Sequence, residues 1–315
     1  MSSNVTVVTD NNTLFSYSNE SFSSRIKWFD HEPVLMAEGV LAFILNSTFL
    51  FVLARNKDLV KCKRITYHVA NLALADTSVG LSVFITATIR GGIVHVGSDG
   101  LAFFQLIKHG AMFVSYMAVL FIAIERIVVI KWHFTWKEIL TLKRVFVTIL
   151  ITWITAVIFV IMVLLYYRLW SFTLYIVILL FCGIAILIAN SVIACLLQYK
   201  KRTLATITGA QQTTNSSKKK ALKLVIMINI IFMVTCLPYA IVYLIVLICF
   251  LPSSNCNFKH QYLLIVYASP FIDMLTNINF FINPIIYIWR DNTYRKAFCS
   301  MFKKPMRLTG RLNFN

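Results

Sequence analysis

The sequence predicts an all-α membrane protein, a bundle of seven transmembrane helices followed by a short amphipathic eighth helix. Two observations favour this fold class. Hydrophobic residues make up 59% of the 315 positions and charged residues only 13%, about half the charged share that is usual in soluble domains. Apolar runs of roughly 20 residues, long enough to cross a bilayer, recur along the chain. The expected solvent of the helices is therefore lipid.

Seven apolar runs follow one another between a polar N-terminal segment and a basic tail. They lie near residues 34–54, 65–89, 101–130, 145–167, 172–198, 222–250 and 261–289. We expect a helical bundle over 34–289, an N-terminal tail over 1–33, the amphipathic helix over 290–303 and a final tail over 304–315. The first 33 residues lack a basic head followed by a short apolar core, so no cleavable signal peptide is expected.

The basic residues indicate how the bundle is oriented. The chain has 30 Lys and Arg residues and a formal net charge of +18. Most of these residues lie in the segments 55–64, 131–144 and 200–223 and in the tail, all on the same side of the predicted bundle. Basic loops stay in the cytosol, so the N-terminus is expected outside the cell. Basic blocks between apolar runs favour contact with membrane lipid and argue against nucleic-acid binding.

The N-terminal tail carries sequence signals of export. Glycosylation sequons begin at Asn4, Asn11 and Asn19. We expect at least one of them to be used, in a multi-pass protein of the plasma membrane with an extracellular N-terminus.

Polar residues inside the runs are the candidate functional residues, because a charge at membrane depth is costly. The ionisable ones are Glu38, Asp76, Lys108, His109, Glu125, Arg126 and Asp273, and the neutral ones include Asn46, Asn71, Ser115, Asn277, Asn279 and Asn283. The sequence shows no nucleophile with a base, no metal-spaced His/Cys cluster and no phosphate loop. We therefore expect no enzymatic activity.

The order of several motifs resembles the class A, rhodopsin-like G-protein-coupled receptors over roughly residues 34–303. Asn46 is similar to that family's first-helix asparagine, and "NLALAD" (Asn71–Asp76) to its second-helix motif. The later motifs are "ERI" (Glu125–Ile127), Trp153, "FMVTCLP" (Phe232–Pro238) and "NPIIY" (Asn283–Tyr287). Each motif alone is a weak signal, but all of them in order on the expected helices make a strong one.

The resemblance implies a receptor that transmits an extracellular signal to a heterotrimeric G protein as helix 6 moves outward. The implied ligand is a small molecule, a lipid or a peptide, and arrestin or other receptors are further expected partners. The implied activation switch comprises Glu125, Arg126, Phe232, Pro238, Pro284 and Tyr287. Arg126 would reach the G protein, and Phe134 would either dock on it or pack on the bundle. Pro284 lacks a backbone donor and should loosen the seventh helix.

Two sites are implied inside the bundle. Asp76, Ser115, Asn279 and Asn283 match positions that surround an allosteric sodium ion in the resembled family; the alternative is a water-filled polar network. No other cofactor is expected. The implied ligand pocket holds Arg90, Lys108, His109, Cys236 and Asp273. Lys108 would bind an anionic ligand group or pair with Asp273, and a lysine at this position disfavours amine recognition.

The chain also departs from the family pattern. Cys236 stands where the family has a sixth-helix tryptophan, the fifth run lacks the usual proline and tyrosine, and the second outer loop is only about residues 168–171, without a cysteine. These features give a weak resemblance to the melanocortin, lipid, cannabinoid and adenosine receptors. They leave open the alternative that the chain is a constitutively active or ligand-silent receptor-like partner protein. A seven-helix transporter or channel is a further alternative, although no internal repeat supports it.

Three of the seven cysteines suggest covalent features. Cys249 and Cys256 could form a local disulfide in the third outer loop if their Cα atoms lie within about 7 Å. Cys299 could be palmitoylated on the amphipathic helix or remain a free thiol.

Overall fold

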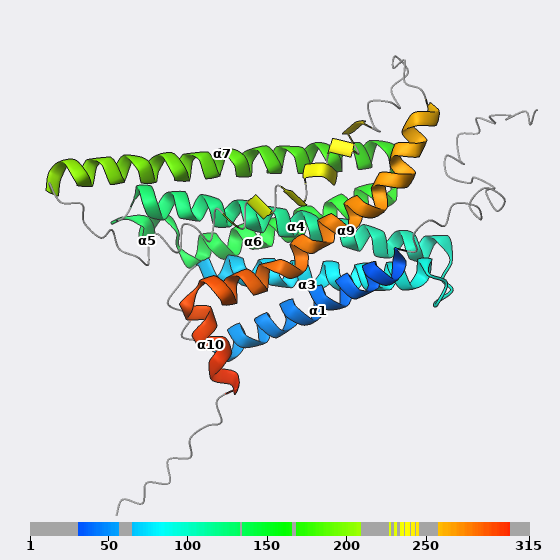
Figure 1. Ribbon diagram of the computed structural model, residues 1–315, viewed down its shortest axis with the longest axis horizontal. Helices are drawn as coiled ribbons and strands as arrows, with labels where there is room; N and C mark the ends of the chain where they lie inside the picture. The colour runs from blue at the N-terminus through cyan, green and yellow to red at the C-terminus, as the bar shows by residue number, and fades with distance from the viewer. Residues whose placement is uncertain are drawn as a thin grey trace, which may run out of the picture. The chain divides into compact units, whose positions relative to one another are not determined.

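The computed structural model describes residues 31–56, 65–132, 134–165, 168–208 and 258–302, and separate positions between 227 and 245. The chain divides into two units, Met1–His31 and Glu32–Asn315, and all described helices belong to the second. They are α1 (Glu32–Arg55), α3 (Ile65–Arg90), α4 (Ser98–Lys131), α5 (Trp136–Ile139), α6 (Leu142–Leu165), α7 (Arg168–Thr208), α9 (Phe258–Arg290) and α10 (Asn292–Phe302), as Figure 1 shows. The described positions between 227 and 245 are helical too, and no strand occurs in the described ranges.

The long helices have the length and composition of membrane spans. Within the described residues, five stretches are long and apolar enough to cross a bilayer: Glu32–Arg55, Ile65–Arg90, Asp99–Lys131, Leu142–Met162 and Pro270–Trp289. The corresponding apolar stretch of α7, Leu180–Leu196, is shorter. The helical fold class predicted from the sequence is confirmed, while the sixth predicted run, 222–250, is described only at its separate helical positions.

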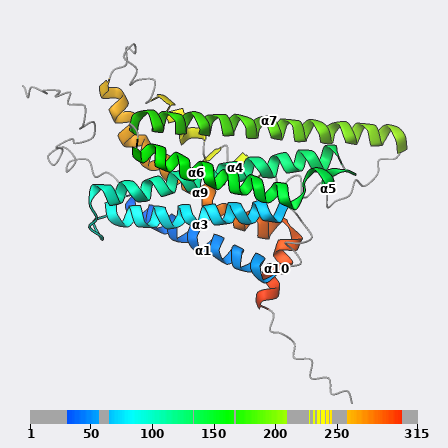
Figure 2. The same cartoon turned by 180° about the vertical axis from the view of Figure 1, so that it is seen from behind.

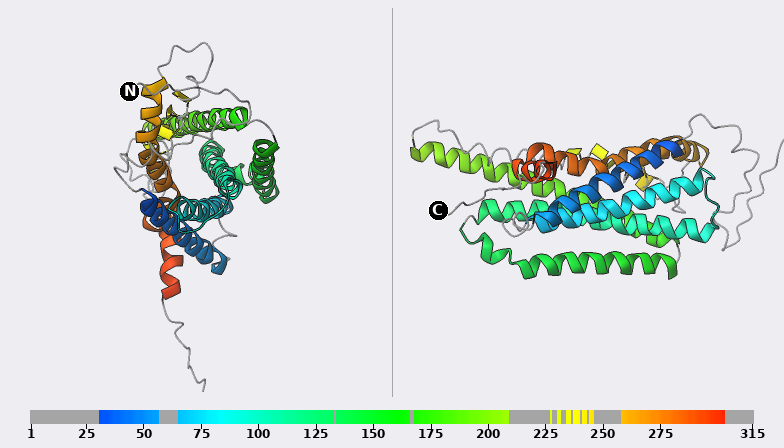
Figure 3. Two further views of the ribbon diagram at one scale, coloured as in Figure 1. Left: turned by 90° about the vertical axis from the view of Figure 1, so that its right-hand side faces the viewer. Right: turned by 90° about the horizontal axis from the view of Figure 1, so that it is seen from below.

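The helices pack side by side with α4 near the middle. Helix α4 contacts α3, α6 and α7, while α1 packs between α3 and α9. Figure 2 shows α3, α4 and α6 from the opposite side, and the left panel of Figure 3 shows the helices nearly end-on. Helix α10 folds back against α1 and α9. Residues from the first, second and seventh predicted runs are therefore neighbours despite their separation in sequence.

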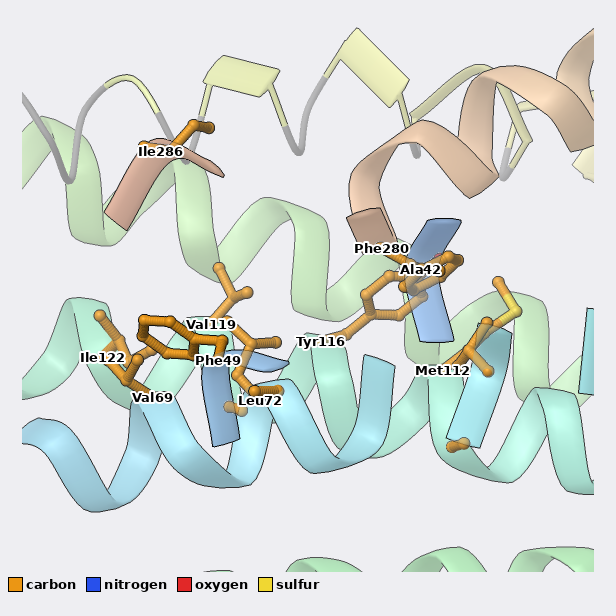
Figure 4. Close-up of a cluster of buried hydrophobic side chains, with 14 of the residues drawn as sticks. Ala42, Phe49, Val69, Leu72, Met112, Tyr116, Val119, Ile122, Phe280 and Ile286 are labelled. Carbon is orange, nitrogen blue, oxygen red and sulfur yellow. The ribbon is translucent and has the colours of Figure 1, made fainter. Parts of the chain in front are cut away.

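The core lies where α1, α3, α4 and α9 face one another. Phe49, Tyr116 and Phe280 are among its largest fully buried side chains, each 1% exposed. Figure 4 shows Tyr116 beside Phe280, and their rings stack with centroids 6.4 Å apart. Many large apolar side chains of α6, such as Leu150 and Ile158, are instead exposed. An apolar exposed face on a helix of this length fits contact with lipid.

Two boundaries differ from the sequence expectation. Residues 168–171, expected as the second outer loop, already form the first turn of α7. No proline or glycine interrupts residues 168–182, so these residues can be helical from the start. At its other end α7 continues to Thr208, well beyond the expected end of the fifth run at residue 198. The added turns are polar and basic, which places them outside the apolar layer.

Glycines allow α1 and α3 to approach each other closely. A Cβ atom built on Gly80 would lie 2.7 Å from the Phe43 nitrogen and 2.9 Å from the Gly39 carbonyl oxygen. A Cβ atom on Gly39 would lie 2.8 Å from the Gly80 carbonyl oxygen. Real Cβ atoms do not come this close to backbone atoms, so these two positions require glycine as the helices are packed. Such small residues at an interface are a common means of helix association in membranes.

Candidate functional site

A buried carboxylate joins three helices in the middle of the bundle. Asp76 on α3 is 0% exposed. Its Oδ1 accepts a hydrogen bond from Ser115 Oγ on α4 at 2.6 Å, and its Oδ2 accepts one from Asn283 Nδ2 on α9 at 2.9 Å. Both donors are neutral, so they stabilise the carboxylate without cancelling its charge. The structure thus brings together three of the four residues that the sequence assigned to the polar centre.

The fourth residue, Asn279, lies one helical turn before Asn283 on α9. Its side chain is 1% exposed, and its Nδ2 has no hydrogen-bond partner among the described residues. A carboxylate, a hydroxyl and two amides supply the oxygen ligands that hard cations prefer. The sodium ion expected at Asp76 and Ser115 stays a prediction, as does its alternative, a water-filled polar network.

Other buried amides form hydrogen bonds that connect the helices around this centre. Asn46 Nδ2 on α1 donates to the carbonyl oxygens of Ala42 at 2.9 Å and Phe280 at 2.7 Å. Trp153 Nε1 on α6 donates to Asn71 Oδ1 on α3 at 2.8 Å. Since polar groups away from water need partners, these bonds help to fix which helices are neighbours.

A second polar cluster contains most of the residues assigned to the ligand pocket. Lys108 and His109 lie on α4, and Asp273 lies on α9. The structure adds Glu38 on α1, which interacts electrostatically with both Lys108 and Asp273. Asn277 Nδ2 on α9 donates to Glu38 Oε2 at 3.2 Å. Glu38 therefore belongs to the same cluster, and the ion pair between Lys108 and Asp273 stays a prediction.

His109 connects this cluster to the sixth helix. Its Nδ1 lies 2.6 Å from the Gln105 carbonyl oxygen, so this nitrogen carries the proton. Its Nε2, 3.5 Å from Tyr239 Oη, is then positioned to accept from that hydroxyl. Arg90 ends α3 with an exposed side chain and interacts electrostatically with His109. Cys236, the remaining pocket candidate, lies outside the described residues.

A third group of side chains gathers where α9 meets α10. The Tyr287 ring stacks on Phe49 with centroids 5.7 Å apart, and the Tyr294 ring on α10 lies 5.6 Å from Phe49 and 5.9 Å from Tyr287. Thr66 Oγ1 on α3 lies 3.3 Å from Tyr294 Oη. Burial raises the pKa of Tyr294 to about 12, so its hydroxyl stays protonated at neutral pH. The group attaches α10 to α1 and α3.

Three further switch residues, Glu125, Arg126 and Pro284, lie on the helices that contribute to or adjoin this aromatic group. Arg126, near the end of α4, interacts electrostatically with Tyr287 and Tyr294. Glu125 beside it is 3% exposed. Pro284 is buried inside α9, which continues through it as helix.

The other predicted site residues are placed as follows. Pro238 is helical and half-buried, Phe134 is 95% exposed between α4 and α5, and Cys299 is exposed on α10. Seven candidates lie outside the described residues: Asn4, Asn11, Asn19, Phe232, Cys236, Cys249 and Cys256. Sequence reasoning did not assign Glu38, Tyr239, Tyr294 or Asn277 to a site. The only signal for Glu38 was a carboxylate within an apolar run, which says nothing of its neighbours.

The described helices form a bundle of the kind found in multi-pass membrane proteins. Its interior contains polar and ionisable residues on facing helices as well as apolar ones. Comparison with protein families makes the class specific. The model described as "7 transmembrane receptor (rhodopsin family)" matches residues 45–287. The chain therefore belongs to the rhodopsin family of seven-transmembrane receptors. A search of curated proteins finds no match.

Proposed function

We propose that the chain is a plasma-membrane receptor that transmits an extracellular ligand signal to a heterotrimeric G protein through outward movement of the sixth helix. Membership of the receptor family supports a signalling function over the transporter or channel alternative. The proposed orientation places the N-terminus outside and α10 along the inner leaflet. Arrestin and other receptors remain proposed further partners.

The observation that carries this proposal is the buried hydroxyl of Tyr287. Its side chain is 4% exposed, and its Oη has no hydrogen-bond partner among the described residues. A buried polar group without a partner costs about 1–3 kcal/mol. A second arrangement of this end of α9, in which the hydroxyl finds a partner, would recover that free energy. Two arrangements that are close in free energy are what a conformational switch requires.

Helix α9 also has the means to change its arrangement. Pro284 lies three residues before Tyr287 and donates no backbone hydrogen bond. The same helix carries Asp273 and Asn277 in the second polar cluster and Asn283 in the Asp76 centre. A ligand that contacts the cluster would therefore act on the helix that carries the switch tyrosine.

The Asp76 centre supports a second, regulatory proposal. Sodium bound by Asp76 and Ser115, with Asn279 and Asn283 beside them, would stabilise the arrangement of α3, α4 and α9 seen here. An ion that binds one arrangement better than another shifts the balance between them, and so acts as an allosteric effector.

Basal G-protein activation tests the main proposal. We would compare the chain with its Arg126→Ala variant in cells, at equal surface expression, across the four G-protein families. We expect basal activation of at least one family, reduced about tenfold or more in the variant, because Arg126 is near the end of α4 where the G protein is proposed to bind and interacts electrostatically with Tyr287. Lys131→Ala is the matched control, since it removes a basic residue at the end of the same helix.

Each outcome has a defined meaning. Equal loss in both variants would indicate a general charge effect and count against the role of Arg126. Absence of basal activation in every family would favour the ligand-silent alternative suggested by Cys236. Strong basal activation without added ligand would favour the constitutive alternative.

A further inference from the structure

Glu38, Asp273 and Asn277 form a group of hydrogen-bond acceptors between α1 and α9, which we call the acceptor cluster. Asp273 and Asn277 are four residues apart on α9 and so share one face of the helix. Glu38 meets them from α1, through the 3.2 Å hydrogen bond to Asn277 and its electrostatic interaction with Asp273. Two carboxylates and an amide oxygen thus lie close together.

One acceptor of the cluster has no donor in the part of the chain that the structure describes. Asn277 is 3% exposed, and its Oδ1 has no hydrogen-bond partner among the described residues. Its Nδ2 donates to Glu38, so the amide group lies against the carboxylate with its oxygen available. A buried acceptor without a donor is costly. The cluster therefore favours a group that brings N–H donors.

The charges around the cluster favour a cation. Glu38 and Asp273 contribute two carboxylates from α1 and α9, and Lys108 contributes one ammonium group from α4. Arg90 on α3 is exposed, so solvent and salt screen its charge more strongly. His109 donates from Nδ1 and accepts at Nε2, which is the neutral form of the ring, so it adds no charge. With two acidic side chains and one ammonium group, a single added cation would balance the charge when both acids are ionised, and its presence would favour the ionised form of Glu38.

We propose that the acceptor cluster is a subsite for the protonated amine or guanidinium group of an extracellular ligand. This proposal rests on the receptor function and extracellular orientation proposed above. It changes the expectation that Lys108 disfavours amine recognition, because Lys108 shares the cluster with two acidic side chains, Glu38 and Asp273. Lys108 limits the subsite to one cation, since a second positive group would meet its charge.

Charge-selective labelling of an introduced cysteine tests the subsite without a known ligand. Gln105 lies one turn of α4 before Lys108 and His109, so Gln105→Cys places a reporter on the same helix face. Intact cells would be treated with 2-aminoethyl methanethiosulfonate, which is cationic, or with 2-sulfonatoethyl methanethiosulfonate, which is anionic. A cysteine that has reacted with either reagent can no longer be labelled by biotin-maleimide. The reaction rate of each reagent is therefore measured as the loss of biotin-maleimide labelling of the surface protein over time. The chain without the introduced cysteine provides the background.

We expect the cationic reagent to react faster, and Glu38→Gln to lower the ratio of cationic to anionic rates by about threefold or more. A unit charge a few ångströms away in a partly buried site changes local ion concentrations by at least this much. Asp99→Asn is the matched control, because it removes an exposed carboxylate from the first turn of α4. It should change the ratio much less.

A higher rate for the anionic reagent, or a ratio that Glu38→Gln leaves unchanged, would overturn the proposal. Leu101→Cys, one turn before Gln105 on the same face of α4, serves as a second reporter if the first variant does not reach the surface. Reporters that reach the surface and react with neither reagent would also overturn it, because the cluster would be closed to extracellular solutes. Labelling needs no G protein, so this result is independent of whether the chain signals.

Discussion

Single polar side chains determine which helices are neighbours in the middle of this bundle. Asp76 connects α3 to α4 and α9, and Asn46 connects α1 to α9. Away from water, loss of one partner leaves the other group unsatisfied, at a cost of about 1–3 kcal/mol. Each of these residues therefore contributes to stability and restricts which arrangements the bundle can adopt.

The Asp76 centre gives a prediction about sodium. The purified receptor should melt at a higher temperature in sodium chloride than in choline chloride at the same concentration. An ion that binds the folded state at ten times its dissociation constant adds about 1.4 kcal/mol of stability. Asp76→Asn should remove this dependence, because the amide has lost the charge that attracts the ion. The measurement is thermal unfolding of the detergent-solubilised protein.

Asp273→Asn is the control, since it removes a carboxylate from the same bundle but leaves the Asp76 centre intact. It should keep the sodium effect. Equal melting temperatures of the unaltered receptor in the two salts would contradict the sodium proposal and leave the Asp76 centre as a hydrogen-bonded network.

Residue contacts were predictable only where the resemblance supplied them. The sequence grouped Asp76 with Ser115 and Asn283 through matched motifs, and the structure joins them by hydrogen bonds. No motif connects Glu38 to Asn277, which follows it by 239 positions. Hydrophobic periodicity indicates which face of a helix is buried, but not which helix covers it. That information comes only from the packed bundle.

At the scale of helices, the closest packing is that of α1 on α3. Gly39 and Gly80 lie at the point of contact, where a Cβ atom on either would lie within 3.0 Å of backbone atoms of the other helix. Backbone atoms cannot move aside as a flexible side chain can. The separation of α1 and α3 is therefore set by these two glycines.

Gly80→Ala should destabilise the receptor by about 1–3 kcal/mol, the usual cost of overpacking a core. Alanine ordinarily stabilises a helix relative to glycine by about 1 kcal/mol, so the expected sign is opposite to the intrinsic preference. Thermal unfolding and surface expression would show the effect. Gly183→Ala on α7 is the matched control, because no described atom beyond the neighbouring backbone of α7 lies within 4 Å of its added Cβ. Equal stability of the two variants would show that α1 and α3 can separate at little cost.

Helix positions were largely predictable, but their ends were less so. The runs expected at 34–54 and 65–89 correspond closely to α1 at Glu32–Arg55 and α3 at Ile65–Arg90. Their apolar character marks the part of a helix that lies in lipid. It does not mark the end of α7, which continues to Thr208 through polar and basic residues. Helix formation there depends on local propensity, so hydropathy alone placed the end too early.

The whole chain is proposed to cross the membrane with its N-terminus outside. The distribution of basic residues supports this orientation. They cluster on the side of the bundle where α4 ends, near Arg126, and where α10 lies. The four parts predicted from the sequence, from the 1–33 tail to the 304–315 tail, stay a prediction. The family match covers only residues 45–287.

Removal of N-linked glycans tests this orientation. Treatment with peptide-N-glycosidase should increase the gel mobility of the receptor, and replacing Asn4, Asn11 and Asn19 together with Gln should abolish the change. Asn46 also begins a sequon, but it is fully buried in α1 and should stay unmodified. An antibody to an N-terminal tag should bind intact cells, whereas a C-terminal tag should need permeabilisation. The reverse pattern of tag access would contradict the proposed orientation.

The bond from Asn46 to the Phe280 carbonyl has a consequence for how the protein is made. Helix α1 leaves the ribosome long before α9, so its amide must wait without this partner while the helices between are synthesised and inserted. The core around Asn46 can close only when translation is nearly complete. A nascent chain that stops before residue 280 would keep only the bond from Asn46 to Ala42 within α1 and would lack the bond that joins α1 to α9. Such a chain would present a partly satisfied amide to lipid, a feature by which membrane quality control can recognise it.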